Sequence, residues 1–510
     1  MKNRIVSAIL ALTIAFSLTA CGNGEKNKEN TSFGRDILIV GTSRDPGLLD
    51  PNETNLQMVQ AVNKQIYETL FSRGDDGTLQ PLLAESWEYE DDCTVVVHLR
   101  KGVKFHNGEE MKASDVLFSL RRASTKGSSS PAVSSINFEK SFAVNDYTLK
   151  LITDEVYVPM LDYLNWPLTA IYSENAYNDA GGDFSKCAIG TGAYKLKKYV
   201  SGDRIEFEAF EDYWGEPAHI KNLIMRIIPE ASSRTMELET GGVDIIYEVA
   251  ATDITRLENN PDTTIYRDAS LCPQLLLINT SHKPFDDVRV RKAIAYAIDR
   301  ETAMKVAYNG TGIVATGYCS PEVRDFAEDV KPYEYDQGKA KELLAEAGYP
   351  NGFSATIHTD TGAERSALTE NIANQLAQVG INLEIISMEP VAYQAMFPDN
   401  LHDMHINGLT CTTGEGDKAF RWFTSSHPSG NNFCHWENKE YDEIIDQAVK
   451  TLDDDARKEL YHKAQQMIHD DCIYIPLLVK EIISASRSNV KGFENDISYE
   501  CPLLKNVYFE

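Results

Sequence analysis

The sequence contains 510 residues, of which 42% are apolar, and carries a formal net charge of −28. This length suits about three domain-sized units with a large hydrophobic core. The acidic balance argues against a nucleic-acid partner, because phosphates would be repelled; it also serves plain solubility. After residue 20, no apolar run is long enough to cross a bilayer.

The N-terminus has the layout of a secretory signal. A positive stretch is followed by apolar residues 5–16 and then by Leu18-Thr19-Ala20-Cys21. This order is typical of a signal peptide over residues 1–20, and the last four residues resemble the bacterial lipobox, whose cysteine takes a lipid. Residues 21–35 are polar and lack apolar periodicity, which predicts a flexible tether. We therefore expect the protein on the outer face of the cytoplasmic membrane, anchored by lipid; the alternative is an ordinary cleaved signal with Cys21 incidental.

The cysteines leave more than one interpretation open. Nine are present, and eight remain when Cys21 is set aside. In an exported protein an even set permits disulfides, although the count does not give their connectivity. No Cys-x-x-Cys pair occurs, which argues against a structural zinc site. Anaerobic life would leave these thiols free.

The first half of the chain has the pattern of short strands with helices between them. Strand 36–40 ends in a Gly/Pro-rich polar loop, and a strand that begins at Gly242 ends at Tyr247-Glu248. Such strand ends are either ligand edges or ordinary connections. Ser114 is the expected N-cap of a helix over residues 115–122. Further strands are expected at 94–99, 148–151, 205–210 and 223–228, and further helices at 58–71 and 231–240.

The middle of the chain predicts a hinge. The run from Gln274 to Asn279 suits a strand buried on both faces. A polar turn follows, and then a helix capped by Asp286 or Asp287 begins, with Asn309-Gly310 as its stop. A buried strand that leads into a new helical segment near the middle of the chain indicates a crossing between two lobes.

The second half alternates helices and strands. We expect helices at 336–347, 365–379, 441–451 and 456–469, and strands at 354–358, 381–386 and 404–409. This alternation predicts a largely parallel α/β lobe. Residues 473–479 form an apolar strand that we interpret as the return crossing.

Several segments resemble the family 5 extracellular solute-binding proteins of bacterial importers, which bind peptides or nickel. They are the block from Pro81 to Ala123, the segment PFDDVRVRKAIAYAIDRE, Tyr67-Glu68-Thr69-Leu70, Gly190-Thr191-Gly192-Ala193-Tyr194 and Tyr213-Trp214. The resemblance implies an α/β, two-lobed periplasmic-binding-protein-like fold with an extra subdomain and a hinge of two crossing segments. The implied boundaries are 36–274 for the first lobe, including a subdomain at about 52–185, 275–480 for the second lobe, and 481–510 for the return to the first.

Two such lobes create a cleft, and ligands in α/β folds bind beyond the carboxyl ends of strands. Closure about the hinge would then bury the ligand. The expected ligand-binding residues are Ser43, Arg44, Asp45, Tyr247, Glu248, Gln274, Cys411, Thr412, Thr413, Glu415, Asp417, Arg421 and Trp422.

The loop at residues 410–417 departs from the family pattern. Oligopeptide-binding relatives carry a Trp-Cys-x-Asp-Tyr motif, whose aspartate pairs with the peptide ammonium and whose cysteine bonds to one in the hinge strand. The resemblance therefore implies a Cys272–Cys411 disulfide, the alternative being two buried thiols. The aspartate is missing, since Thr412 or Thr413 stands in its place. Because a buried ammonium needs a counter-charge, either Glu415 or Asp417 replaces it or the ligand has no ammonium there.

The resemblance implies a binding protein without catalysis or cofactor. Its expected partners are a peptide or comparable small solute and the permease and ATPase of an ATP-driven importer, and the chain is expected to be a monomer. Alternatives are a glycan or chelated nickel as ligand, or a peptide-sensing lipoprotein. Four histidines, His402, His405, His427 and His435, raise the nickel alternative, but scattered histidines do not make a metal site. An exported hydrolase is disfavoured because no GxSxG or HExxH motif occurs.

Overall fold

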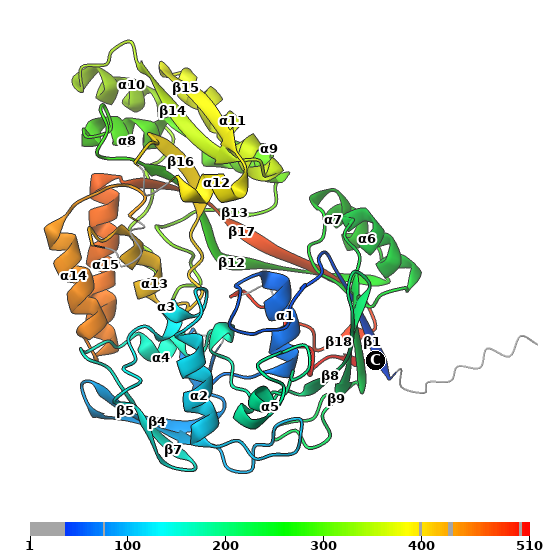
Figure 1. Ribbon diagram of the computed structural model, residues 1–510. Coiled ribbons are helices and arrows are strands. Elements are labelled where there is room, and N and C mark those ends of the chain that lie inside the picture. The colour runs from blue at the N-terminus through cyan, green and yellow to red at the C-terminus, as the bar shows by residue number, and fades with distance from the viewer. Residues whose placement is uncertain (1–35, 75–76, 397–399, 427–431, 499–501) are drawn as a thin grey trace, which may run out of the picture. The chain divides into compact units, whose positions relative to one another are not determined.

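One long mixed sheet organises the fold and runs through both lobes of an α/β architecture (Figure 1). The computed structural model describes residues 36–510 except 75–76, 397–399, 427–431 and 499–501. In spatial order the strands of this sheet are β15 (Ile381–Met388), β14 (Phe353–Asp360), β16 (Met404–Gly408), β12 (Thr263–Ile278), β17 (Tyr474–Arg487), β11 (Ile245–Ile246), β1 (Ile37–Thr42), β10 (Asn222–Ile227), β9 (Arg204–Ala209) and β8 (Tyr194–Val200), with β13 (Ile313–Val314) paired to β17.

The two crossings between the lobes are β12 and β17. They pair antiparallel over most of their length, from Thr263 opposite Arg487 to Leu277 opposite Tyr474. Both strands are longer than the sequence predicts. The predicted apolar runs cover only part of each strand. Residues 263–269 of β12 are half-buried or exposed, whereas β17 is buried again at residues 482–486. The predicted boundaries at 274/275 and 480/481 fall inside these strands.

The first lobe places helices beside strands β1, β8, β9, β10 and β11. Its helices are α1 (Gln57–Ile66), α6 (Ala231–Thr240) and α7 (Ala251–Glu258). The C-terminal tail forms the short pair β18 (Val490–Lys491) and β19 (Tyr508–Phe509). Leu504 and Val507 of this tail share a core with Leu38 and Val40 of β1. The tail therefore completes the core of the lobe in which the described chain begins.

The inserted subdomain has its own antiparallel sheet and its own core. The sheet has the order β4 (Ala84–Asp91), β5 (Thr94–Leu99), β7 (Thr148–Ile152) and β6 (Phe142–Asn145). The remaining elements are β2 (Phe71–Arg73), β3 (Leu79–Pro81), α2 (Ala113–Ala123), α3 (Ser130–Val133), α4 (Met160–Tyr163), the 3-10 turn Pro167–Thr169 and α5 (Glu174–Asp179). Ser114 is not the N-cap of α2, because the helix already begins at Ala113 and the Asp115 carboxylate accepts the Lys112 amide.

The second lobe covers its strands with helices on both sides of the sheet (Figure 1). These are α8 (Val288–Ala297), α9 (Arg300–Tyr308), α10 (Gln337–Glu346), α11 (Ala363–Ala377), α12 (Pro390–Ala395), α13 (Gly416–Phe420), the 3-10 turn Arg421–Phe423, α14 (Lys439–Lys450) and α15 (Asp454–Asp471). The single helix expected after Asp287 is two helices. Asp299 starts the second one, since its carboxylate accepts the Thr302 amide at 3.1 Å.

The expectation of a largely parallel second lobe is half right. Strand β14 runs parallel to both β15 and β16. Strand β16, however, pairs antiparallel with β12, and β12 pairs antiparallel with β17. The reason is that the chain enters the lobe on one hinge strand and leaves it on the neighbouring one. Helix–strand alternation does not reveal this return.

Three motifs that carry the family resemblance meet at one buried carboxylate. Glu68, just after α1, accepts hydrogen bonds from the Thr191 hydroxyl at 2.8 Å, the Tyr213 hydroxyl at 2.7 Å and the Trp214 indole at 2.8 Å. Burial raises the pKa of Glu68 above its ordinary value, and these donors lower it in part. The residues of these motifs therefore pack around Glu68, at a junction outside the lining of the cavity described below.

Gly190 and Gly192 sit so close to α1 that only glycine fits. A Cβ at Gly190 would lie 2.1 Å from the Ile66 carbonyl oxygen, and the Gly192 amide donates to the same oxygen at 2.9 Å. His106 joins this junction from the subdomain. Its amide donates to the Gly190 carbonyl, and its Nε2 lies 2.8 Å from the Gly192 carbonyl oxygen.

His106 gives the junction a pH dependence. Burial lowers the pKa of His106 to about 4, whereas an unfolded histidine titrates near 6.5. Between these values the unfolded chain binds a proton that the folded chain does not, so acidification from pH 6.5 to 4 favours unfolding. We expect His106 to contribute a loss of about 2–3 kcal/mol over this range. Denaturant unfolding of the wild type and of His106→Gln at several pH values measures this loss. The difference between their free energies of unfolding should become smaller as the pH falls from 6.5 to 4.

A control separates this effect from general acid sensitivity. His219 is exposed, so His219→Gln should leave the pH profile of the free energy of unfolding unchanged. Parallel profiles for the wild type and His106→Gln between pH 6.5 and 4 would contradict the assignment.

Among the described residues, no helix is long and apolar enough to cross a membrane.

Candidate functional site

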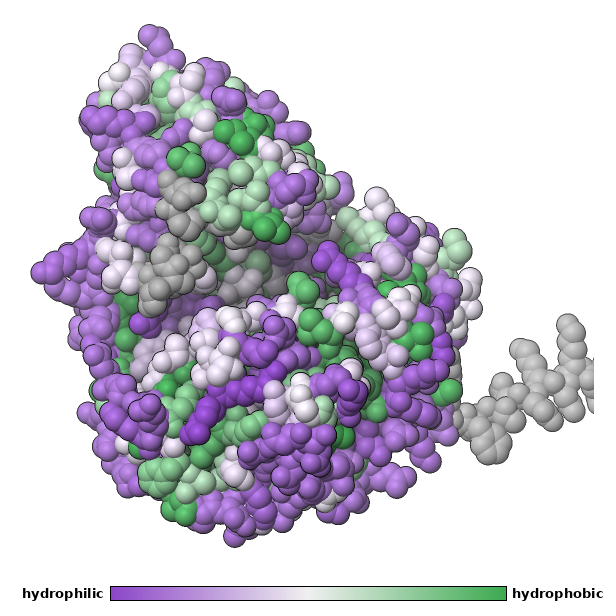
Figure 2. Space-filling model, viewed as in Figure 1, coloured by the Kyte–Doolittle hydropathy of each residue, from purple (hydrophilic) through white to green (hydrophobic). Residues whose placement is uncertain are grey.

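A cavity of about 590 Å³ lies at the carboxyl edge of strands β1 and β11 and reaches the hinge strand β17. On the face shown in Figure 2, the surface is hollowed between the two lobes. The first lobe contributes Thr42–Asp45, Leu56–Val59, Ala61, Ala231, Arg234 and Tyr247–Ala251; β17 contributes Lys480–Ser484; the second lobe contributes Tyr308, Thr311 and Glu364. Both lobes and the hinge strand β17 therefore line a single cavity, as expected of an interlobe binding site.

The topology explains why these segments meet. Strand β1 pairs parallel with β11, with Gly41 opposite Ile246. Parallel neighbours end at the same edge of a sheet, so the loops that follow them open into the same crevice. Of the predicted site residues, Ser43, Arg44, Asp45, Tyr247 and Glu248 all line the cavity. Whether they contact a ligand stays a prediction.

Asp45 supports the loop after β1. Its carboxylate accepts hydrogen bonds from the Gly47 amide at 2.8 Å, the Ser201 hydroxyl at 2.9 Å, the Gly202 amide and the Tyr199 hydroxyl. Burial acts to raise the pKa of Asp45, but these hydrogen bonds outweigh it and hold the pKa below its ordinary value. Asp45 thus fixes the loop that carries Arg44.

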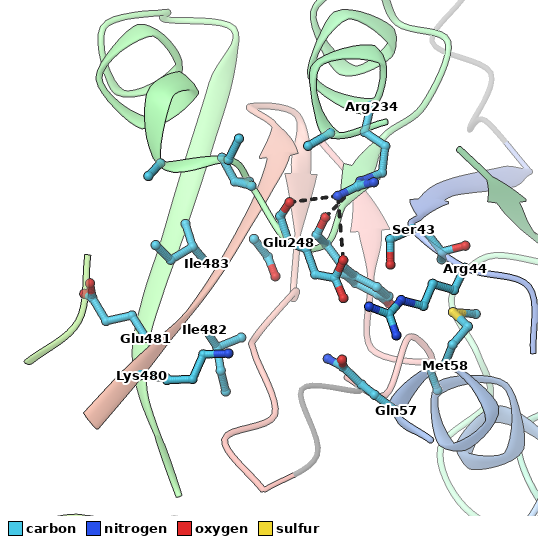
Figure 3. A pocket seen from close by; sticks show the side chains of 18 of the residues that line it. Ser43, Arg44, Gln57, Met58, Arg234, Glu248, Lys480, Glu481, Ile482 and Ile483 are labelled. Carbon is cyan, nitrogen blue, oxygen red and sulfur yellow. Dashed lines mark hydrogen bonds and ion pairs between the residues drawn. The ribbon is translucent and has the colours of Figure 1, made fainter. Parts of the chain in front are cut away.

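Arg234 is a cavity residue that the sequence analysis missed. It is 2% exposed, and its guanidinium donates to the Tyr247 carbonyl at 3.2 Å and the Glu248 carbonyl at 2.9 Å. It also lies 3.7 Å from the Glu248 carboxylate (Figure 3). Glu248 has a φ of 55°, a left-handed conformation that most side chains avoid. Arg234 therefore holds a strained backbone turn at the wall of the cavity.

Lys480 was also missed, because the predicted return strand stops at residue 479. In the structure β17 continues to Arg487, and Lys480 lies in the part that lines the cavity. Its side chain and that of Arg44 point into the same space from different elements (Figure 3). A prediction that extended the strand beyond residue 479 would have placed Lys480 on β17 and made it a candidate for the cavity.

The second group of predicted residues lies outside this cavity. Gln274, Cys411, Thr412, Thr413, Glu415 and Asp417 are buried, and Arg421 and Trp422 are half-buried. None of them appears in the cavity lining. Trp422 packs against Phe433 with ring centroids 5.9 Å apart, and the Lys418 amine lies 5.1 Å from the centroid of its ring.

The two acids expected to bind an ammonium are already used by the protein. The Asp417 carboxylate accepts hydrogen bonds from the hydroxyls of Tyr157 at 2.7 Å and Tyr163 at 3.1 Å, and Arg421 lies 3.4 Å away. The Glu415 carboxylate caps α13 by accepting the Asp417 amide at 2.8 Å. Burial raises the pKa of Glu415 well above its ordinary value. The contacts of Asp417 with Tyr157 and Tyr163 tie the second lobe to the subdomain.

The expected Cys272–Cys411 disulfide is not formed. Both residues are thiols in the structure, and the Cys411 thiol donates to the Glu415 carbonyl at 3.1 Å. Cys411 shares a core with Leu271, Leu275 and Leu277 of β12, and the Leu271 carbonyl accepts the Cys411 amide. Successive side chains of a strand face opposite ways, so Cys272 turns away, toward Gln274 and Gly408. Leu271, one residue before Cys272, lies opposite Cys411, and the predicted Cys272–Cys411 disulfide is therefore wrong.

The nickel and lipid expectations involve residues that the structure covers only in part. Among the described residues, no group of three or more His, Cys, Asp or Glu side chains is arranged to hold a metal ion. The rings of His402 and His405 lie 4.7 Å apart, and those of His402 and His435 lie 5.6 Å apart. His427 and the lipid-acceptor candidate Cys21 lie outside the described residues.

Comparison with known proteins agrees with this geometry. Residues 78–431 match the model of the bacterial extracellular solute-binding proteins, family 5 Middle. The Glutathione-binding protein GsiB of Escherichia coli is 31% identical over 502 residues, which cover 96% of each chain. The periplasmic binding protein DppA of Helicobacter pylori in complex with the peptide STSA is 28% identical, with a TM-score of 0.77 and coverage of 93% of this chain and 98% of that one.

A further similar structure is a complex with an organic acid. AgaA from A. tumefaciens R10 in complex with agropinic acid is 26% identical, with a TM-score of 0.78, and the match covers 93% of this chain and 99% of that one. The sequence match and the two-lobed fold agree. The chain belongs to the bacterial extracellular solute-binding proteins of family 5.

Proposed function

We propose that this protein is the substrate-binding lipoprotein of an ATP-binding-cassette importer and that it captures peptides or a comparable small solute between its lobes. The observation that carries the proposal is the cavity at the ends of β1 and β11, which both lobes and the hinge strand β17 line. Rotation about β12 and β17 would enclose a ligand there. The closed form would then dock on a transmembrane permease driven by its ATPase.

Three features support the finer parts of the proposal. The relatives named above bind glutathione, a peptide and agropinic acid, so peptides and small organic acids are the ligand classes to test first. The lipobox-like sequence that ends at Cys21 supports attachment at the outer face of the cytoplasmic membrane. The relatives named above are themselves named as binding proteins, which supports binding as the function.

Calorimetric titration tests the proposal. The full-length protein, purified in detergent, would be titrated with a tri- to pentapeptide pool, the same pool N-acetylated, and glutathione. Saturable binding of any of them with micromolar or tighter affinity is expected. A loss of binding on acetylation would mean that an ammonium is recognised. Absence of binding to all three would reject the peptide assignment and direct the search to non-peptide acids, glycans and metal chelates.

A further inference from the structure

The charges around the cavity are not balanced. Its lining contains the cations Arg44, Arg234 and Lys480 and the acids Asp45, Glu248, Glu364 and Glu481. Several of these side chains already have partners within the protein, so only the others are available to a ligand. The charges of those other side chains limit the charge of the solute that fits.

Arg234, Glu248, Asp45 and Glu481 are committed to the protein. Arg234 is buried and pairs with Glu248, and Asp45 accepts the hydrogen bonds of its own loop. The Glu481 carboxylate accepts a hydrogen bond from the Arg267 guanidinium at 2.8 Å and another from the Gly312 amide at 2.6 Å. Its carboxylate is thus held by Arg267 of the neighbouring strand β12 and by the amide of Gly312. Glu481 is therefore not the counter-charge of Lys480.

Arg44, Lys480 and Glu364 differ from these residues. Across the part of the chain that the structure describes, no hydrogen bond or ion pair involves any of their side chains. Arg44 reaches in from the loop after β1, Lys480 from the hinge strand, and Glu364 from the start of α11 in the second lobe. Figure 3 shows Arg44 and Lys480 extending toward the same space. An open cavity can leave these charges to water, but closure cannot, because a desolvated charge needs a partner.

We propose that Lys480 is a specificity-determining residue and that Arg44 and Lys480 together select ligands with two anionic groups and a single ammonium, such as a peptide with one extra carboxylate. The inference rests on the proposed function. The planar guanidinium of Arg44 can hold a carboxylate through two parallel hydrogen bonds, whereas Lys480 acts as a point charge. Glu364 supplies the counter-charge for the ammonium from the opposite lobe. Such a ligand balances all three side chains when the cavity closes.

Pairs of tripeptides that differ only in one carboxylate provide the probe. Glu-Ala-Ala is compared with Gln-Ala-Ala, and Ala-Glu-Ala with Ala-Gln-Ala, at a fixed physiological salt concentration. The quantity measured is the ratio of the two affinities within a pair, on full-length protein in detergent. For the wild type we expect the better Glu peptide to bind about 10- to 100-fold more tightly than its Gln partner, as for one hydrogen bond to a charged group.

Variants of the cavity residues show which side chains produce this affinity ratio. For a given pair, the variant, Lys480→Gln or Arg44→Gln, at the residue that binds the side-chain carboxylate should reduce the ratio at least about tenfold while the affinity of the Gln peptide changes little. The variant at the residue that binds the C-terminal carboxylate should weaken both peptides of that pair alike. Lys480→Arg should retain the ratio. Lys197 is exposed and outside the cavity lining, so Lys197→Gln is the matched control for overall charge. Unchanged thermal unfolding of each variant shows that the fold is intact, since neither side chain holds other parts of the protein.

Each outcome decides the inference. A wild-type ratio near one with measurable binding of both peptides overturns the charge selection and leaves the proposed function in place. A ratio that survives in both Lys480→Gln and Arg44→Gln, or that falls equally in Lys197→Gln, overturns the role of these residues. If no tripeptide binds, the inference fails together with the peptide part of the proposed function.

Discussion

Replacing Glu68 by leucine is expected to lower the free energy of unfolding by at least about 3 kcal/mol. The carboxylate accepts hydrogen bonds from Thr191, Tyr213 and Trp214 in a buried setting. Leucine fills a similar volume but accepts nothing, so three donors lose their partner at a cost of about 1–3 kcal/mol each. Denaturant unfolding followed by tryptophan fluorescence measures the loss directly, because Trp214 is one of the three donors.

An intermediate variant makes this prediction specific. Glu68→Gln keeps one acceptor oxygen but turns an amide toward the remaining donors, so its stability should fall between those of the wild type and Glu68→Leu. Glu85 is exposed on β4, and Glu85→Leu serves as a control that should change stability by less than about 0.5 kcal/mol. Equal stability of all three Glu68 forms would mean that the junction tolerates unpaired donors, and the packing explanation of these motifs would be wrong.

Local patterns predicted much of the fold. Strand β5 has the predicted bounds, and the predicted strand 223–228 and helix 231–240 correspond to β10 and α6 within one residue. Strands β5 and β10 have apolar residues at a clear period, and such signals are local. The hinge also followed from a local signal, the apolar run after Gln274.

The errors concern contacts between distant segments. Pairing register decided the disulfide, since Leu271 rather than Cys272 faces the core beside Cys411. The strand end at Tyr247 was predicted from the sequence, but Arg234, which holds it, comes from a helix whose sequence shows no clear apolar face. Lys480 was missed because polar residues in the second half of β17 end the apolar run before the strand itself ends. A sequence shows which side chains are charged, whereas only the fold shows which charges neutralise each other.

Asp417 provides the second large effect, and it separates two roles for the same residue. We expect Asp417→Leu to lower the free energy of unfolding by at least about 2 kcal/mol, because two hydroxyls lose their acceptor at a cost of about 1–3 kcal/mol each. The variant leaves Arg421 without its buried acid and the hydroxyls of Tyr157 and Tyr163 without an acceptor. Because these tyrosines belong to the subdomain, the loss should also make the contact between subdomain and second lobe easier to open. Hydrogen exchange of the amides in α4 and α13 would detect this loosening.

The same variant tests the sequence-based hypothesis that Asp417 pairs with a ligand ammonium. If the contacts with Tyr157 and Arg421 are its role, the folded variant should bind peptide within about threefold of the wild type, because the free energy lost concerns unfolding rather than the cavity. Glu384 is exposed on β15, and Glu384→Leu is the control for removing a carboxylate from the second lobe. The opposite pattern, with stability preserved and discrimination between free and N-acetylated peptides abolished, would assign the ammonium to Asp417 after all. In that case Tyr157 and Tyr163 would have to release the carboxylate when ligand enters, and the contact between subdomain and second lobe would be part of the binding step.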